Sequence, residues 1–122
     1  MNGELVVVDS KVLIDLLKGD ANVREAIRGL KTSVAFITEV EVLSWPGSTD
    51  RDMELMSALL GQSVVVQFDV SIKALTIQLR RTTKMKLPDC FIAATAIVSE
   101  APLITRDKGF KKVAHLIEVR MV

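Results

Sequence analysis

Short, wholly apolar segments alternate along the chain with segments whose apolar residues recur at helical spacing. Leu5–Val8 is such an apolar run, rich in β-branched residues, and this is typical of a strand that is buried on both faces. Val12, Leu13, Leu16 and Leu17 then share one face of a helix. The same criteria predict strands at residues 5–8, 33–37, 64–68, 103–105 and 116–122, of which the last has the alternating pattern of an edge strand.

Helices are predicted between these strands. Asp9 and Ser10 offer an N-cap for the first, and residues 89–99 have almost no polar face, which indicates a buried helix. The other helices are predicted to begin near residues 20–22, 38, 53 and 72. Strands that alternate with helices favour a parallel sheet. We therefore expect an α/β fold with three layers, α/β/α, around a parallel sheet of four or five strands, in a single domain spanning residues 1–122.

The composition limits the class of protein. Hydrophobic residues make up 49% of the 122 residues, which excludes a disordered chain. The single cysteine, Cys90, excludes an internal disulfide and fits a reducing compartment. No apolar run approaches the ~18 residues that a membrane-spanning helix requires. We therefore expect a cytoplasmic protein with no membrane partner.

The charged residues are unevenly distributed, although the net charge is only +1. Of the 15 acidic side chains, 11 lie in residues 1–72, whereas 10 of the 16 basic side chains lie in residues 73–122. A solvated surface is one explanation for this asymmetry. A metal site beside a phosphate-binding surface is another.

Four acidic residues are predicted to lie at one edge of the sheet. Asp9 directly follows the first strand, Glu41 lies in the first turn after the second, and Asp107 comes two residues after the fourth. Asp89 begins the helix 89–99, which must run antiparallel to the fourth strand because only a short link joins them. Ligands of open parallel sheets bind at the carboxyl ends of the strands, which is the edge where these acids are expected.

Carboxylates gathered at one edge repel each other unless a cation lies between them. A ligand set of oxygen atoms, without His or Cys, suits Mg²⁺ or Mn²⁺. A divalent metal held in this way activates water and neutralises charge on phosphorus, so the pattern indicates hydrolysis of phosphodiester bonds.

Each acid also has a purely structural interpretation. Asp9 and Asp89 could be ordinary N-caps, Asp107 could be a turn residue, and the spacing from Thr38 to Glu41 is that of a capping box. The pattern alone leaves both interpretations open.

Four segments around these acids resemble the motifs of the PIN-domain family, and specifically of its VapC-type toxins. They are VVVDSKVLIDLL with Asp9, FITEVEVLSWPG with Glu41, LRRTTKMKLPDCFIAATAI with Asp89 and PLITRDKGFKKV with Asp107. Their order, spacing and predicted context agree with the family, and the resemblance covers nearly the whole chain.

The resemblance implies that Asp9, Glu41, Asp89 and Asp107 form the catalytic metal site of an endoribonuclease, with Mg²⁺ or Mn²⁺ as cofactor and RNA as substrate. It also implies that the chain is the toxin of a toxin–antitoxin pair, that an antitoxin protein covers the site, and that the toxin forms a homodimer.

Other residues near the acids could assist this chemistry. Ser10 and Thr105 could hydrogen-bond to a metal-bound water or to a phosphate, although a cap or strand-end role suits them equally. Several basic residues flank two of the acids and could contact the RNA backbone. These candidates are Arg80, Arg81, Lys84, Lys86, Arg106 and Lys108.

Two alternative interpretations of the sequence give a protein without nuclease activity. A phosphoacceptor receiver domain has similar length and a similar sheet, and Asp69 could be its phosphoacceptor. It would however need a pair of acids after the first strand, where Ser10 follows Asp9, and a lysine after the fifth. An inactive PIN scaffold that acts through binding is the other alternative.

Overall fold

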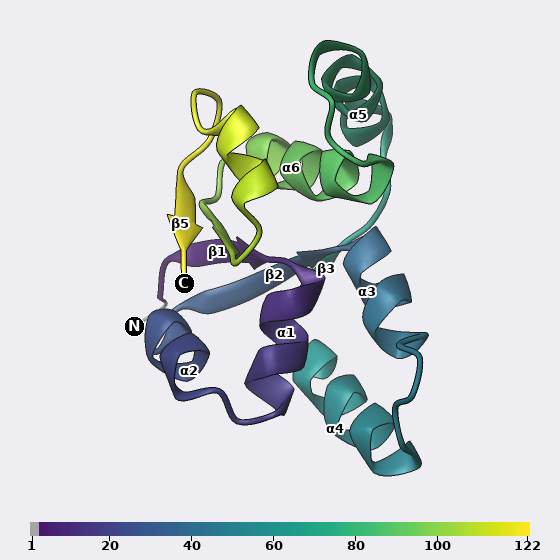
Figure 1. The fold of residues 1–122 in the computed structure, drawn as a ribbon, viewed down its shortest axis with the longest axis vertical. Coiled ribbons are helices and arrows are strands. Elements are labelled where there is room, and N and C mark those ends of the chain that lie inside the picture. The colour runs from purple at the N-terminus through teal and green to yellow at the C-terminus, as the bar shows by residue number, and fades with distance from the viewer. Residues whose placement is uncertain (1–2) are drawn as a thin grey trace.

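A parallel sheet of five strands runs through the middle of the molecule (Figure 1), which the computed structural model describes for residues 3–122. The strands are β1 (Leu5–Val8), β2 (Lys31–Ala35), β3 (Val64–Val66), β4 (Leu103–Thr105) and β5 (Val119–Met121). Their order across the sheet is β3-β2-β1-β4-β5, and each neighbouring pair is parallel. The central strand β1 is therefore the one that carries Asp9 at its end.

Helices cover both faces of this sheet (Figure 1). They are α1 (Ser10–Leu17), α2 (Ala21–Ile27), α3 (Phe36–Leu43), α4 (Asp50–Gly61), α5 (Val70–Thr82), α6 (Leu87–Ser99) and the 3-10 helix η1 (Lys108–Val113). α1, α2 and α4 lie on one face, and α6 and η1 lie on the other with α5 outside α6. The predicted three-layer α/β/α fold is thus confirmed. Within residues 3–122, no helix has the length and apolar character to cross a membrane.

The core is divided into two halves by β1. Val6 and Val8 pack with Met56 of α4 on one face, whereas Val7 packs with Ala93 of α6 on the other, and all five side chains are almost completely buried. This explains why β1 is an unbroken apolar run, since both of its faces are covered. Burial on both sides also fixes the position of the residue that follows the strand.

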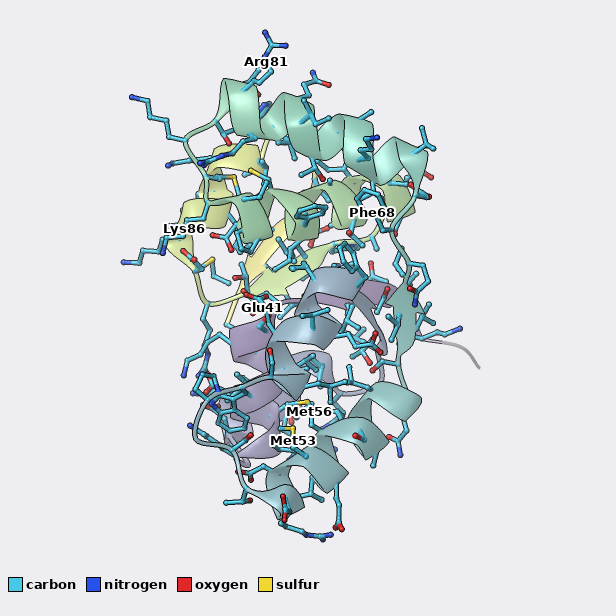
Figure 2. The ribbon with its side chains drawn as sticks, turned by 90° about the vertical axis from the view of Figure 1, so that its right-hand side faces the viewer. Glu41, Met53, Met56, Phe68, Arg81 and Lys86 are labelled. Atoms are coloured by element: carbon cyan, nitrogen blue, oxygen red, sulfur yellow. The ribbon has the colours of Figure 1, made fainter. Side chains whose placement is uncertain are left out.

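α5 and α6 form a helical hairpin. The connector between them is only residues 83–86, because α5 continues to Thr82 and α6 begins at Leu87. We expected a longer polar connector, residues 82–88, to lead back to the start of the last long helix. Figure 2 shows instead that α5 itself covers this distance, from Phe68 near its start to Arg81 near its end.

Several predicted boundaries are wrong. The strand predicted at 64–68 is β3, which ends at Val66, and the strand predicted from residue 33 is β2, which begins at Lys31. The apolar residues Phe36 and Ile37 were expected to end the second strand, but β2 ends at Ala35 and they form the first turn of α3. The last predicted strand, 116–122, is shorter in the structure, where β5 is Val119–Met121. η1 was not predicted, since six residues of a 3-10 helix leave little periodic signal in a sequence.

Candidate active site

Asp9 joins the central strand to the first helix. It is the N-cap of α1, and its Oδ1 accepts a hydrogen bond of 3.0 Å from the backbone N–H of Val12. Its other oxygen, Oδ2, accepts a hydrogen bond from the hydroxyl of Thr105 at the end of β4. The residue is only 4% exposed. Helix capping thus accounts for the hydrogen bond to Oδ1 of this buried carboxylate, whereas Oδ2 faces the end of the neighbouring strand β4.

Thr105 connects two of the four acids. Its buried hydroxyl donates to Asp9 and accepts a hydrogen bond of 3.0 Å from the backbone N–H of Asp107. The Asp107 carboxylate is exposed and caps η1 by accepting a 2.8 Å hydrogen bond from the N–H of Gly109. A Cβ atom at position 109 would lie 3.0 Å from Asp107 Oδ1, so the glycine leaves room for this carboxylate.

Glu41 is held beside Asp9 through the adjacent residue. Its Oε1 accepts a hydrogen bond of 2.6 Å from the hydroxyl of Ser10. The alternative role of Glu41, in a capping box with Thr38, is excluded because α3 begins at Phe36 and its N-cap is Ala35. Glu41 therefore lies in the second turn of the helix rather than the first, and its side chain is free to serve the site.

Asp89 lies in the first turn of α6, three residues after Lys86. Pro88 precedes it in that turn, where a proline does not disrupt the helix because its missing N–H would have no intrahelical acceptor. Figure 2 shows Lys86, just before α6, and Glu41 on the same side of the molecule. The charges of Asp107, Asp9 and Glu41 all act on Asp89, so the start of α6 lies near the carboxyl edge of the sheet.

Two of the four carboxylates, Asp9 and Asp89, have raised pKa values, to which the charges of the other acids contribute. Burial raises the pKa of Asp9, and the charges of Asp107 and Glu41 raise it further against the hydrogen bonds from Thr105 and Val12. Burial also raises the pKa of Asp89, with added contributions from the other three acids. The nearby ammonium of Lys86 acts in the opposite direction on Asp89. The edge is thus a strongly negative, partly dehydrated cluster.

The chemistry of this donor set fits a divalent metal, although the side chains do not form a complete ligand group. Among residues 3–122, no three or more acidic, histidine or cysteine side chains are placed so that together they could hold a metal ion. Mg²⁺ keeps several water ligands and needs only one or two carboxylates in direct contact. Two carboxylates with raised pKa values are also better neutralised by a cation than left as charged neighbours.

Two of the six predicted RNA-backbone residues are engaged within the protein. Arg106 is paired with Asp15 at 2.9 Å and with Asp20 at 2.8 Å. Arg80 donates a hydrogen bond of 2.6 Å to the carbonyl oxygen of Met85. The remaining four are exposed, at the end of α5, in the connector before α6 or at the start of η1, and they are Arg81, Lys84, Lys86 and Lys108.

Two acids outside the cluster have structural roles. Asp69, the position that a receiver domain would phosphorylate, is the N-cap of α5 and accepts a 2.8 Å hydrogen bond from the N–H of Ile72. Asp20 is the N-cap of α2, and its hydrogen bond from Arg106 lowers its pKa. The link from Arg106 to Asp20 and Asp15 was not predicted, since 86 and 91 residues separate the partners and no local pattern reports such a contact.

Comparison with solved structures shows the same architecture in several bacterial complexes. A toxin–antitoxin complex from Klebsiella pneumoniae matches with a TM-score of 0.80 and 27% identity over 93% of this chain and 94% of that one. VapBC2 from Rickettsia felis bound to a promoter DNA fragment matches with a TM-score of 0.82 and 16% identity over 97% and 98%. VapBC-1 from nontypeable Haemophilus influenzae matches with a TM-score of 0.82 and 21% identity over 96% and 97%.

A comparison with curated protein sequences gave no match. The family model of the PIN domain, in contrast, matches residues 6–116, a range that contains all four acids of the cluster. With most of its length matched by this model, the chain belongs to the PIN domain family.

Proposed function

We propose that this protein is a metal-dependent endoribonuclease and the toxin of a toxin–antitoxin pair. The observation that carries the proposal is the cluster of Asp9, Glu41, Asp89 and Asp107 at the carboxyl edge, where burial and mutual charge raise the pKa of two of them. Membership of the PIN family supports a nuclease, and similar structures that are toxin–antitoxin complexes support the toxin assignment. We further propose that residues 1–122 form a single PIN domain.

In this proposal the four carboxylates hold Mg²⁺ or Mn²⁺. The metal, when bound, supplies the acidity that activates water and the positive charge that stabilises the phosphate undergoing cleavage. Asp9 is the most deeply buried of the four acids, and hydrogen bonds to both of its oxygens fix its position. Thr105 donates a hydrogen bond to one oxygen of Asp9, and Ser10 donates one to an oxygen of Glu41. These hydrogen bonds fix the orientation of both carboxylates, as outer hydrogen-bond partners do for the ligands of a metal.

Exposed basic residues are proposed to bind the RNA backbone. Lys86 precedes α6, and its charge partly offsets the rise in the pKa of Asp89. Lys108 follows Asp107 directly and is exposed. Cations in these positions can neutralise the phosphates that flank the cleaved bond. Arg81 and Lys84, at the α5–α6 turn, extend the same surface.

The proposed partners are an antitoxin protein and a second copy of the chain. We propose that the antitoxin covers the acidic edge, and the similar structure from Klebsiella pneumoniae is a toxin–antitoxin complex. Exposed apolar side chains on α3 and α5, such as Val40, Val70 and Ile77, offer a surface for self-association. We propose the cytoplasm as the location, consistent with the buried, unpaired Cys90.

The test is to incubate the purified protein with structured RNAs, with and without Mg²⁺ or Mn²⁺, and to map the cuts. We expect metal-dependent cleavage at discrete positions, its loss with a chelator, and a strong loss in Asp89→Asn. Cleavage that continues in Asp89→Asn would point to a contaminating nuclease. A folded protein that binds metal or RNA but cuts neither structured nor unstructured RNA would favour the inactive-scaffold alternative.

A further inference from the structure

Arg106 lies in the chain between two residues of the candidate site, Thr105 and Asp107. Its guanidinium makes three hydrogen bonds to two carboxylates outside that site. Nη1 lies 2.9 Å from Asp15 Oδ2 and 2.8 Å from Asp20 Oδ2, and Nη2 lies 3.2 Å from Asp20 Oδ1. The side chain is 25% exposed. A forked cation with two carboxylate partners is thus fixed in one direction.

Both partners of Arg106 are themselves held in place. Asp15 belongs to α1, is 7% exposed, and accepts a second hydrogen bond of 2.9 Å from Lys11 one turn earlier. Asp20 is the N-cap of α2 and accepts a 3.1 Å hydrogen bond from the backbone N–H of Val23. The end of β4 is therefore attached to fixed points on two helices.

Two consecutive residues of this strand end hold α1 at opposite ends. Thr105 donates to Asp9, the N-cap of α1, and Arg106 pairs with Asp15 in its last turns and with Asp20 just beyond them. Because Thr105 also accepts the N–H of Asp107, any shift of this strand end would move two acids of the cluster relative to each other.

We propose that Arg106 is a positioning residue for the carboxylate site. It fixes the turn between β4 and η1 on α1 and α2, and so keeps Thr105 and Asp107 in place relative to Asp9. This inference rests on the metal-dependent function proposed above. It replaces the expectation that Arg106 contacts RNA, because two carboxylates already accept three hydrogen bonds from the guanidinium and neutralise its charge.

An RNA-binding role and a positioning role of Arg106 predict opposite effects of a substitution at its partner Asp20. If Arg106 binds RNA, Asp20→Asn weakens its intramolecular pairing and strengthens RNA binding. If Arg106 positions the site, Asp20→Asn weakens the attachment and acts in the same direction as Arg106→Gln. A matched control is Arg120→Gln, since Arg120 also pairs with two acids, Glu4 and Glu118, at another strand.

The experiment compares wild type, Arg106→Gln, Arg106→Lys, Asp20→Asn and Arg120→Gln. Circular dichroism first establishes that each is folded. Hydrogen exchange then follows the amides of Asp107 and Gly109, calorimetry gives the Mn²⁺ affinity, and cleavage of one RNA at several salt concentrations gives kcat, KM and the salt dependence. Arg106→Lys and Asp20→Asn are milder changes and keep the test valid if Arg106→Gln does not fold.

We expect faster exchange at both amides in Arg106→Gln and Asp20→Asn, with no change in Arg120→Gln. Loss of an outer hydrogen-bond partner of a metal site costs roughly 10–100-fold in metal affinity or activity, and we expect Mn²⁺ affinity and kcat to fall within that range. KM for RNA and the salt dependence should stay constant. Arg106→Lys should be intermediate, because an ammonium keeps the charge but cannot reproduce the fork.

Two results would overturn the proposal. One is a raised KM with a shallower salt dependence in Arg106→Gln and tighter RNA binding in Asp20→Asn, which would make Arg106 an RNA contact. The other is unchanged amide exchange and Mn²⁺ affinity in both variants, with at most the loss of stability seen in Arg120→Gln. If the wild type neither binds Mn²⁺ nor cuts RNA, the proposed function fails separately, and the exchange of the two amides still decides whether Arg106 holds the turn.

Discussion

At the scale of single residues, Asp9 combines a structural and a chemical role. An N-cap requires one acceptor, which Asp9 Oδ1 provides to Val12, and asparagine caps helices about as well as aspartate. The charge of Asp9 is therefore not needed for the cap. Its pKa is raised above the ordinary value of 3.8 by burial and by the neighbouring acids, so ionisation opposes folding in the metal-free protein.

We predict that Asp9→Asn abolishes RNA cleavage but leaves the metal-free protein at least as stable as the wild type at pH 7. In the wild type the folded state holds more protons than the unfolded state between pH 3.8 and the raised pKa, so the contribution of Asp9 to stability falls as pH rises through that window. The variant lacks this contribution. Urea unfolding at several pH values measures it, and a strongly destabilised variant at neutral pH would show that Asp9 is mainly a cap.

Thr105 supports two acids with one hydroxyl. We predict that Thr105→Val destabilises the protein by about 1–3 kcal/mol, because the buried Asp9 carboxylate and the Asp107 amide both lose a partner. Metal affinity should fall as well. Thr105→Ser keeps the hydroxyl and serves as the control, measured by urea unfolding and calorimetry. Equal losses in the serine and valine variants would mean that the methyl group, not the hydroxyl, matters here.

At the scale of elements, the sequence predicts helices and strands best where all residues of a segment have the same burial. β1 is buried on both faces, and its unbroken apolar run shows this directly. The junction of β2 and α3 was misplaced because Phe36 and Ile37 are apolar in either structure, and a short apolar run does not distinguish a strand from a buried helix. Glu41 was nevertheless placed at the right edge, since a shift of the helix start by two residues leaves it in the same element.

α6 owes its position to small side chains. Ala93, Ala94 and Ala96 are completely buried in a helix that packs against both α5 and the sheet. We predict that Ala94→Leu destabilises the protein by roughly 1–3 kcal/mol through overpacking and lowers cleavage by displacing Asp89 at the start of the helix. Val98→Leu, at a 39% exposed position of the same helix, is the control. Similar unfolding curves for both variants would indicate a loosely packed interface.

At the scale of the whole molecule, contacts between distant segments could not be predicted from the sequence. The pairing of Arg106 with Asp15 and Asp20 joins residues that no local pattern relates. The sequence could predict that the four acids share one edge of the sheet, because sheet topology, rather than side-chain packing, brings the ends of parallel strands together.

We predict that Mg²⁺ or Mn²⁺ stabilises the folded protein, and that this effect weakens as pH falls. A ligand present at 100 times its Kd stabilises the folded state by about 2.7 kcal/mol. Metal binds the ionised carboxylates, whose pKa values are raised at Asp9 and Asp89, so acid competes with the metal. Thermal unfolding with metal or with a chelator, at several pH values, measures both effects. Equal melting temperatures with and without metal at pH 7 would contradict the prediction.

We also predict that the protein self-associates. The methionines and leucines of α4, which suggested this from the sequence, are partly used in the core, since Met56 and Leu60 are buried. The stronger reason is the exposure of Val40, Val70 and Ile77 on α3 and α5. Sedimentation at micromolar concentration should show a dimer, and Ile77→Lys should shift it to the monomer. A wild type that sediments only as a monomer would exclude this interface.

The position of β1 between β2 and β4 has a consequence for the order in which the site is completed during translation. Asp9 leaves the ribosome early, but its partner Thr105 is 96 residues further along the chain. At ~5–20 residues per second, that interval is roughly 5–20 s. Until then the nascent chain has only part of the cluster, with Asp89 and Asp107 still to be made or to fold. Under the function proposed above, the nuclease would therefore stay inactive beside the messenger and ribosomal RNA that produce it, and an antitoxin would need to act only on the finished fold.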